Sequence, residues 1–171
     1  MISVIIPTLN RADSLGCVLE SLTKQNAPAA EFEVLVIDNG STDHTKAVAQ
    51  VFADKLLSAQ LRYIFEPEPG LLSGRHRGAA EAKGDILSFL DDDVELDPGW
   101  LTAIHSAFKD EMVQLIGGRN LPRYESEPPE WLQYFWQKQY SGRLCTELSL
   151  LDLGSVRRVV DANYIWGLNF S

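Results

Sequence analysis

The stretch Ile86-Leu87-Ser88-Phe89-Leu90-Asp91-Asp92-Asp93 joins a short, mostly apolar run to three consecutive acids. An apolar run of this length that ends abruptly at polar residues is typical of a buried strand. Because adjacent carboxylates repel one another, each of the three acids needs either solvent or a cation beside it. The stretch therefore predicts a buried strand that delivers an acidic segment at its carboxyl end.

Strand-like segments recur along the first two thirds of the chain, at residues 2–6, 33–37, 61–65, 86–90 and 113–116. Between them, apolar residues at helical spacing predict helices whose first turns are capped near Asp13, Ser41 or Thr42, Ser73 and Asp97. Strands that alternate with helices favour right-handed βαβ units and a mostly parallel sheet. We therefore predict an α/β fold with a Rossmann-like, mostly parallel central sheet flanked by helices.

The charge of the chain is concentrated in one short segment. The 171 residues include 24 acids and 15 bases, a formal net charge of −9. Residues 85–97 hold six acids and no base, which leaves 18 acids and 15 bases elsewhere, a net charge of only −3. The acidic balance excludes nucleic acid and anionic membrane surfaces as main partners, because binding to these needs a basic face.

The remaining composition indicates one globular domain, with 45% hydrophobic residues. No apolar run reaches the ~18 residues of a transmembrane helix, and the residues after Met1 do not resemble a signal peptide. Cys17 and Cys145 lack metal-ligand spacing, and we expect Cys17 to be buried in an apolar helical stripe. We therefore expect a cytoplasmic protein that could associate with the inner face of a membrane only through residues outside this chain.

The three aspartates are candidate ligands for a hard cation. In an extended backbone Asp91 and Asp93 point to one side and Asp92 to the other. Mg²⁺ and Mn²⁺ prefer oxygen ligands and often take one or two carboxylates together with substrate phosphates. A solvated acidic loop is the alternative, but it does not explain why a buried strand delivers the run directly.

Other polar segments also follow predicted strand ends. In parallel sheets the carboxyl ends of the strands form the ligand-binding edge, so residues 7–11, 38–43 and 91–93 are expected to share one rim. Asn39-Gly40 is a turn signal, whereas Asp38 at the strand end can accept hydrogen bonds from a base or a ribose. Residues 70–78 place Arg75 and Arg77 near a helix start that suits a phosphate, with a solvated basic turn as the alternative.

These motifs together resemble glycosyltransferase family 2. They are Val4-Ile5-Ile6-Pro7-Thr8-Leu9-Asn10-Arg11, residues 36–43, residues 70–78 and Phe89-Leu90-Asp91-Asp92-Asp93. The resemblance covers residues 1 to about 118 and resumes at the closing residues 166–171. It implies a GT-A fold and inverting transfer of a hexose from a nucleotide diphosphate sugar, in particular a UDP-sugar, to a hydroxyl of a saccharide, lipid or other acceptor.

The resemblance also assigns roles to residues of the first three motifs. Pro7, Thr8 and Arg11 match the positions that contact the nucleotide at the end of the first strand. Asp38 matches the carboxylate that recognises the base. Arg75 matches an arginine near the base and the diphosphate, although the residues beside it differ from the family pattern.

In the acidic run, Asp92 matches the ribose-binding position and Asp93 the metal-binding position, while Asp91 begins the DxD-type motif. The resemblance therefore implies Asp91 and Asp92 as nucleotide contacts, and Asp93 with Asp91 as ligands of Mg²⁺ or Mn²⁺. A divalent cation would stabilise the charge that builds on the leaving nucleoside diphosphate. A general base must also take the proton of the acceptor hydroxyl.

That base is not recognisable in the sequence. The late acids Glu147, Asp152 and Asp161 do not form the Glu-Asp pair that the family places after its DxD-type motif. We therefore expect the base beyond Ser171. Residues 1–171 are then a single catalytic domain that is incomplete at its C-terminus, with a nucleotide-sugar-binding half over 1–118 and the start of an acceptor-side half over 119–171.

Two interpretations of function remain besides the enzyme. A non-catalytic nucleotide-sugar-binding module fits the missing base, whereas a receiver-like, Mg²⁺-dependent phosphoryl-transfer domain would need a lysine after a late strand. A dinucleotide-dependent oxidoreductase is excluded because residues 7–11 contain no glycine. An aromatic cluster at Trp131, Tyr134, Phe135 and Trp136 is expected to pack in the core, with an acceptor platform as the alternative.

Overall fold

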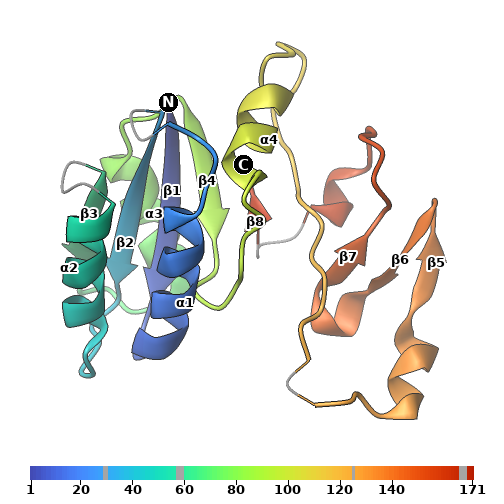
Figure 1. Cartoon of the computed structure of the whole chain (residues 1–171), viewed down its shortest axis with the longest axis horizontal. Coiled ribbons are helices and arrows are strands. Elements are labelled where there is room, and N and C mark those ends of the chain that lie inside the picture. The colour runs from blue at the N-terminus through green and yellow to red at the C-terminus, as the bar shows by residue number, and fades with distance from the viewer. Residues whose placement is uncertain (29–30, 57–59, 125, 166–168) are drawn as a thin grey trace.

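The computed structural model describes residues 1–28, 31–56, 60–124, 126–165 and 169–171. Figure 1 shows an α/β part formed by the earlier residues, with a smaller part of short strands beside it. The closing segment Trp166–Ser171, part of the family resemblance, is described only from Asn169 onward. The α/β part contains the buried core, and it positions every residue discussed below as a donor-site candidate.

The central sheet has five strands in the order β3-β2-β1-β4-β8. Strands β1 to β4 pair in parallel, and β8 runs antiparallel to β4. The strands are β1 (Ile2–Thr8), β2 (Phe32–Asp38), β3 (Leu61–Phe65), β4 (Ile86–Leu90) and β8 (Asn169–Phe170). The α/β fold with a mostly parallel sheet, predicted from the sequence, is confirmed.

Helices cover both faces of this sheet (Figure 1). They are α1 (Ala12–Thr23), α2 (Thr45–Lys55), α3 (Leu71–Glu81) and α4 (Trp100–Ala107). Because strand side chains alternate between faces, Val4 and Ile6 pack with α1, α2 and α4, whereas Ile5 packs toward α3. Strands β1 and β2 are thus buried on both faces, which explains their continuous apolar sequences.

A single carboxylate, that of Asp43, serves the starts of two helices. One oxygen accepts a hydrogen bond from the backbone N–H of Ala12 at 3.1 Å, and the other accepts from Thr45 N–H at 2.9 Å. Asp13 therefore lies inside the first turn of α1 and does not cap it. The caps predicted at Ser41 or Thr42 are likewise wrong, since α2 begins only at Thr45.

The strand predicted over residues 113–116 is also wrong. These residues have no regular structure, and the edge position beside β4 belongs to β8. Ile116 instead exchanges two backbone hydrogen bonds with Ser171, at 2.8 and 3.0 Å, and Gly117 bridges Phe170. The apolar run is thus a neighbour of β8, a segment that joins the sheet from the far end of the chain.

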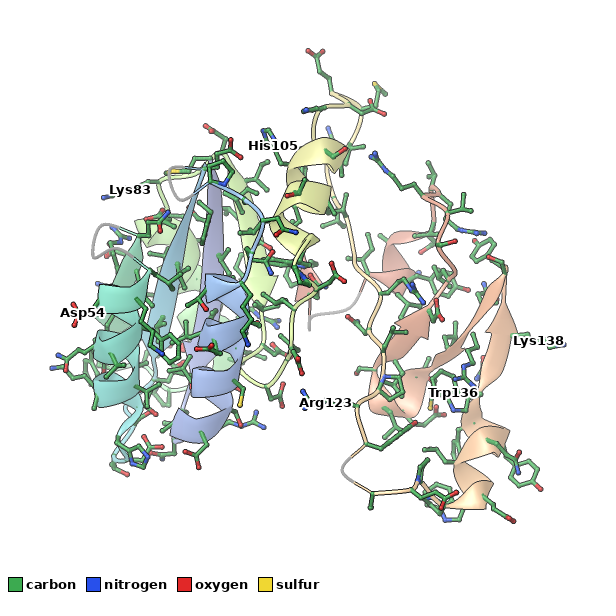
Figure 2. The ribbon with its side chains drawn as sticks, in the orientation of Figure 1. Asp54, Lys83, His105, Arg123, Trp136 and Lys138 are labelled. Atoms are coloured by element: carbon green, nitrogen blue, oxygen red, sulfur yellow. The ribbon has the colours of Figure 1, made fainter. Side chains whose placement is uncertain are left out.

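The smaller part is a three-stranded antiparallel sheet of β5 (Gln137–Gln139), β6 (Gly142–Cys145) and β7 (Leu150–Asp152). Three 3₁₀ turns accompany it, η2 (Glu130–Phe135), η3 (Thr146–Leu148) and η4 (Ala162–Tyr164). In η2 only Leu132 is buried, while Trp131 and Tyr134 are 58% and 81% exposed. Trp136 lies on this small sheet (Figure 2) under the guanidinium of Arg143. The prediction that the aromatic cluster packs in the core is therefore wrong.

The prediction that Cys17 is buried is also wrong. Cys17 is exposed on α1, because Leu15, Val18 and Leu19 occupy the buried side. On α4, His105 is similarly exposed (Figure 2). Among the described residues, the helices are too short or too polar to cross a bilayer.

Candidate functional site

The site is built around the acidic run that follows β4. Asp92 is 5% exposed, and its carboxylate accepts a hydrogen bond from Thr8 Oγ1 at 2.7 Å. Arg11 Nη1 donates to the other oxygen of Asp92 at 3.0 Å, while Arg11 Nη2 donates to Asp93 Oδ2 at 2.8 Å. Because β1 and β4 are parallel neighbours, their carboxyl ends bring Thr8 and the aspartates together. One guanidinium therefore bridges two carboxylates at the predicted rim.

The first aspartate of the run has a different partner. Arg75 on α3 donates from Nη2 to Asp91 Oδ1 at 3.0 Å. Its guanidinium carbon lies 5.6 Å from the centre of the Phe170 ring on β8, so the arginine is held between α3 and the closing strand. The structure thus brings together Thr8, Arg11, Arg75 and all three aspartates, as the sequence predicts.

The ionisation of the cluster reflects burial and charge acting in opposite directions. Burial is the largest cause that raises the pKa of Asp91 and of Asp92, and repulsion by neighbouring aspartates adds to it. Arg75 lowers the pKa of Asp91, and Thr8 and Arg11 lower that of Asp92, but the net shift of both is upward. The charge of Asp92, followed by that of Asp93, raises the pKa of Arg11. Three carboxylates face two guanidinium groups, so the cluster keeps a net negative charge that favours a cation.

A hollow of about 250 Å³ opens at these side chains. Its lining residues come from the end of β1, the turn after β2, the start of α3 and the acidic run, and they are Pro7, Thr8, Leu9, Arg11, Asn39, Gly70, Leu71, Asp91, Asp92 and Asp93. Pro7, Thr8 and Arg11 line this hollow together with the aspartates, and their contact with a nucleotide stays a prediction. Leu9, Asn39, Gly70 and Leu71 lie within the predicted segments 7–11, 38–43 and 70–78, but the sequence singled out none of them as a site residue.

Asp38 does not line this hollow. Its side chain is buried at the end of β2, where one oxygen accepts from the N–H groups of Gly40 and Ser41 at 3.1 and 2.7 Å. The other oxygen accepts from Tyr63 Oη at 2.5 Å, and burial together with Asp38 raises the pKa of that phenol. Recognition of a base by Asp38 stays a prediction, and the neighbouring Asn39 is the residue that faces the hollow.

Helix α3 reaches the hollow because two of its turns carry glycine. A Cβ at Gly74 would lie 2.7 Å from Asn39 Oδ1 and 3.0 Å from Pro7 Cβ, and one at Gly78 would lie 2.2 Å from Ile5 Cγ2. Only glycine allows the helix to approach β1 so closely. Along the same helix Arg77 pairs with Glu81, which fits the alternative of a solvated basic turn for that arginine.

The late acids all have local partners in the smaller part of the molecule. Asp152 accepts from Arg119 Nε at 2.9 Å, and Asp161 accepts from the N–H of Asn163 at 2.9 Å. Glu147 accepts from the neighbouring hydroxyl of Thr146 at 3.0 Å. None of the three acids lines the hollow beside the aspartates.

The acidic run suits a cation that takes few protein ligands. In the part of the chain that the structure describes, no group of three or more His, Cys, Asp or Glu side chains is placed to hold a metal ion together. Asp93 is the most exposed of the three aspartates, with 42% of its side chain accessible, against 29% for Asp91 and 6% for Asp92. Such a site matches Mg²⁺ or Mn²⁺ bound by one or two carboxylates and completed by phosphate oxygens.

Comparisons with known proteins agree with this geometry. The family model described as glycosyl transferase family 2 matches residues 3–161. The chain is 36% identical over 117 residues to glycosyltransferase AglE of Haloferax volcanii, a match that covers 68% of this chain and 38% of AglE. It therefore spans well under half of that relative.

Solved structures give the same result. S. aureus TarS 1–349 in complex with UDP-GlcNAc superimposes with a TM-score of 0.65 at 26% identity, over 77% of this chain and 37% of TarS. The mannosyltransferase PcManGT of Pyrobaculum calidifontis, in complex with GDP-Man and Mn²⁺, gives a TM-score of 0.65 at 25% identity, over 70% of this chain and 35% of that protein. The chain therefore has the GT-A fold and belongs to glycosyltransferase family 2.

Proposed function

We propose that this chain binds a nucleotide diphosphate sugar in the hollow beside Asp91, Asp92 and Asp93, and that it serves the metal-dependent, inverting transfer of the sugar to an acceptor hydroxyl. The observation that carries the proposal is the convergence of Thr8, Arg11 and the three aspartates on one hollow at the strand ends. A related structure that holds UDP-GlcNAc supports a UDP-sugar as donor. One that holds GDP-Man keeps a GDP-sugar as the alternative.

The hollow offers complementary groups for the polar parts of such a donor. Thr8 and Arg11 fix the buried carboxylate of Asp92, which can accept hydrogen bonds from the hydroxyls of a ribose. Arg11, which lines the hollow, offers a guanidinium fork of the shape that binds phosphate oxygens in pairs. Asp92 thus offers hydrogen-bond acceptors to the nucleoside, and Arg11 offers donors to the diphosphate.

Asp93, together with Asp91, is the proposed ligand of the divalent cation. The exposed carboxylate of Asp93 is directed to the same guanidinium as Asp92, so a cation at Asp93 would lie next to the donor hollow. When bound, Mg²⁺ or Mn²⁺ would supply Lewis-acid stabilisation of the charge on the leaving nucleoside diphosphate. Asp92 stays with the ribose in this arrangement, because Thr8 holds it in place.

Transfer with inversion also requires a general base on the acceptor side of the site. An attacking hydroxyl has to lose its proton to a general base on the face of the sugar opposite the diphosphate. Glu147, Asp152 and Asp161 are committed to local contacts, so we do not assign that base to them. A nucleotide-sugar-binding module without transfer activity is the alternative function, which an assay has to distinguish from a transferase.

Calorimetric titration tests the donor site. UDP and GDP are titrated separately into the protein with Mn²⁺, with Mg²⁺ and with EDTA. We expect one nucleotide to bind at least tenfold more tightly with a divalent cation than with EDTA, and Asp93→Ala to lose that difference. Asp54→Ala is the matched control, because Asp54 is an exposed aspartate near the end of α2 (Figure 2) and does not line the hollow.

Two results would contradict the proposal. In the first, neither nucleotide binds in the presence of a cation. In the second, Asp93→Ala binds a nucleotide with the same cation dependence as the unchanged protein. If binding occurs, release of sugar from the matching nucleotide sugar, measured with and without candidate hydroxyl acceptors, separates a transferase from a binding module.

A further inference from the structure

We infer that Arg11 is an internal counter-cation of the donor site, which holds Asp93 in the free protein and competes with a divalent cation for its carboxylate. The inference rests on the proposed function, since it concerns the same aspartates. It adds a competition between a side chain of the protein and the metal ion for one carboxylate.

The fork of Arg11 occupies two carboxylates at once. Nη1 lies 3.0 Å from Asp92 Oδ1 and Nη2 lies 2.8 Å from Asp93 Oδ2, both within the range of charge-assisted hydrogen bonds. A guanidinium has donors and no acceptors, so it cannot share the carboxylate lone pairs that it uses with a metal ion. A cation that takes the same lone pair of Asp93 Oδ2 must displace Nη2, and a cation on any other lone pair of this carboxylate would lie close to the positively charged guanidinium, which repels it.

The two aspartates differ in what they lose when Arg11 leaves. Asp92 is buried and keeps the hydrogen bond from Thr8 Oγ1 at 2.7 Å. The side chain of Asp93 is 42% exposed, so water or a metal ion can reach it directly. Release of Arg11 therefore frees Asp93 as a ligand and leaves Asp92 in position for the nucleotide.

Arg11 itself is placed to make this exchange. Its backbone is fixed as the residue before the first turn of α1, while its side chain is 49% exposed and lines the hollow. The bridge between Arg11 and Asp93 joins two half-exposed groups, and such bridges contribute little to stability, so this bridge can open at a small cost. The released guanidinium remains next to the position proposed for the diphosphate, which it can bind as a fork.

The test measures binding of Mn²⁺ alone, followed by the electron paramagnetic resonance signal of the free ion. We expect R11Q to bind Mn²⁺ roughly five- to tenfold more tightly than the unchanged protein, the size expected for removal of a cation that forms one half-exposed and one partly buried charge pair. R11K, which keeps the charge but loses the fork, should lie between the two. Thermal melts confirm that each variant is folded.

A double-mutant cycle separates competition for Asp93 from a general effect of charge. If Arg11 acts by occupying Asp93, the gain of R11Q disappears when D93N is also present. A gain that persists in the D93N background overturns the inference, because it shows an unspecific electrostatic effect. Unchanged, weaker or undetectable Mn²⁺ binding by R11Q also overturns it.

The inference and the proposed function can fail separately. If the unchanged protein binds neither UDP nor GDP with Mn²⁺, the proposed donor site is wrong. If nucleotide and Mn²⁺ bind together as expected but R11Q leaves the affinity for Mn²⁺ alone unchanged, only the role of Arg11 is wrong.

Discussion

Replacement of Thr8 by valine tests how the fold holds its central aspartate. Valine has nearly the shape of threonine, so Thr8→Val removes the hydroxyl that donates to Asp92 Oδ2 and leaves the packing almost unchanged. Both residues are buried, at 4% and 5% exposure, and water therefore cannot easily replace the lost donor. The variant isolates a single hydrogen bond to a buried carboxylate.

The expected cost follows from the charge of the acceptor. A hydrogen bond to a charged group contributes about 1.5–3 kcal/mol, and the lower half of this range applies because Arg11 still satisfies the other oxygen of Asp92. Thr8 also lowers the pKa of Asp92, against the larger effect of burial, so its loss raises that pKa further. The contribution of Thr8 is therefore fully present above the pKa of Asp92 and declines as the pH falls through it.

Urea denaturation of both proteins between pH 7 and pH 4 measures this difference. Thr45→Val is the matched control, because Thr45 Oγ1 donates to Asp43 Oδ1 at 2.6 Å but Asp43 is exposed and can be hydrated in its place. We expect the control to lose less stability at pH 7 than Thr8→Val. A loss below about 0.5 kcal/mol for Thr8→Val at pH 7, or a loss that does not shrink on acidification, would refute the reasoning.

Three other predictions concern packing and charge. Gly78→Ala should cost about 1–3 kcal/mol in urea denaturation, because the new Cβ would lie 2.2 Å from Ile5 Cγ2; a variant as stable as the parent would contradict the close contact. Burial raises the pKa of Asp91, so Asp91→Asn should raise the melting temperature at pH 7, with the gain vanishing as the pH falls through that pKa; a gain that is the same at every pH would point to another cause. Leu132→Ala should lower the melting temperature more than Trp131→Ala, since only the leucine is buried. The reverse order would support the prediction that the aromatic cluster packs in the core.

The parallel part of the fold could be predicted because its signals are local. Strands β1 to β4 appear in the sequence as short apolar runs that end at polar turns, and the helices between them dictate parallel pairing. Parallel strands place their carboxyl ends at one edge, so Thr8 and Asp92 could be expected as neighbours although 84 positions separate them. The residues that meet at the rim could therefore be predicted from the sequence, although the distances between them could not.

The remaining features depend on contacts that no local pattern reveals. The apolar residues 113–116 have the composition of a strand, but β8 occupies the edge position beside β4. At the end of β2, Asn39 lines the hollow, whereas Asp38 is directed to Tyr63. The two residues are adjacent, and successive side chains at a strand end point in opposite directions. In the 3₁₀ turn η2, Leu132 is buried and the aromatic residues beside it are not, which the helical spacing of those aromatics does not predict.

The acidic run suggests how charge orders the binding of donor and metal. A fold selected for stability alone would not place Asp91 and Asp92 where burial opposes their ionisation, so their positions favour a functional role. With Arg11 and Arg75 in place, the three carboxylates leave about one negative charge, which repels a bare diphosphate. A divalent cation reverses the sign of the cluster, and its arrival frees the guanidinium of Arg11 for phosphate oxygens. Under the proposed function, metal and nucleotide should therefore each strengthen the binding of the other by the same factor, because such coupling is reciprocal.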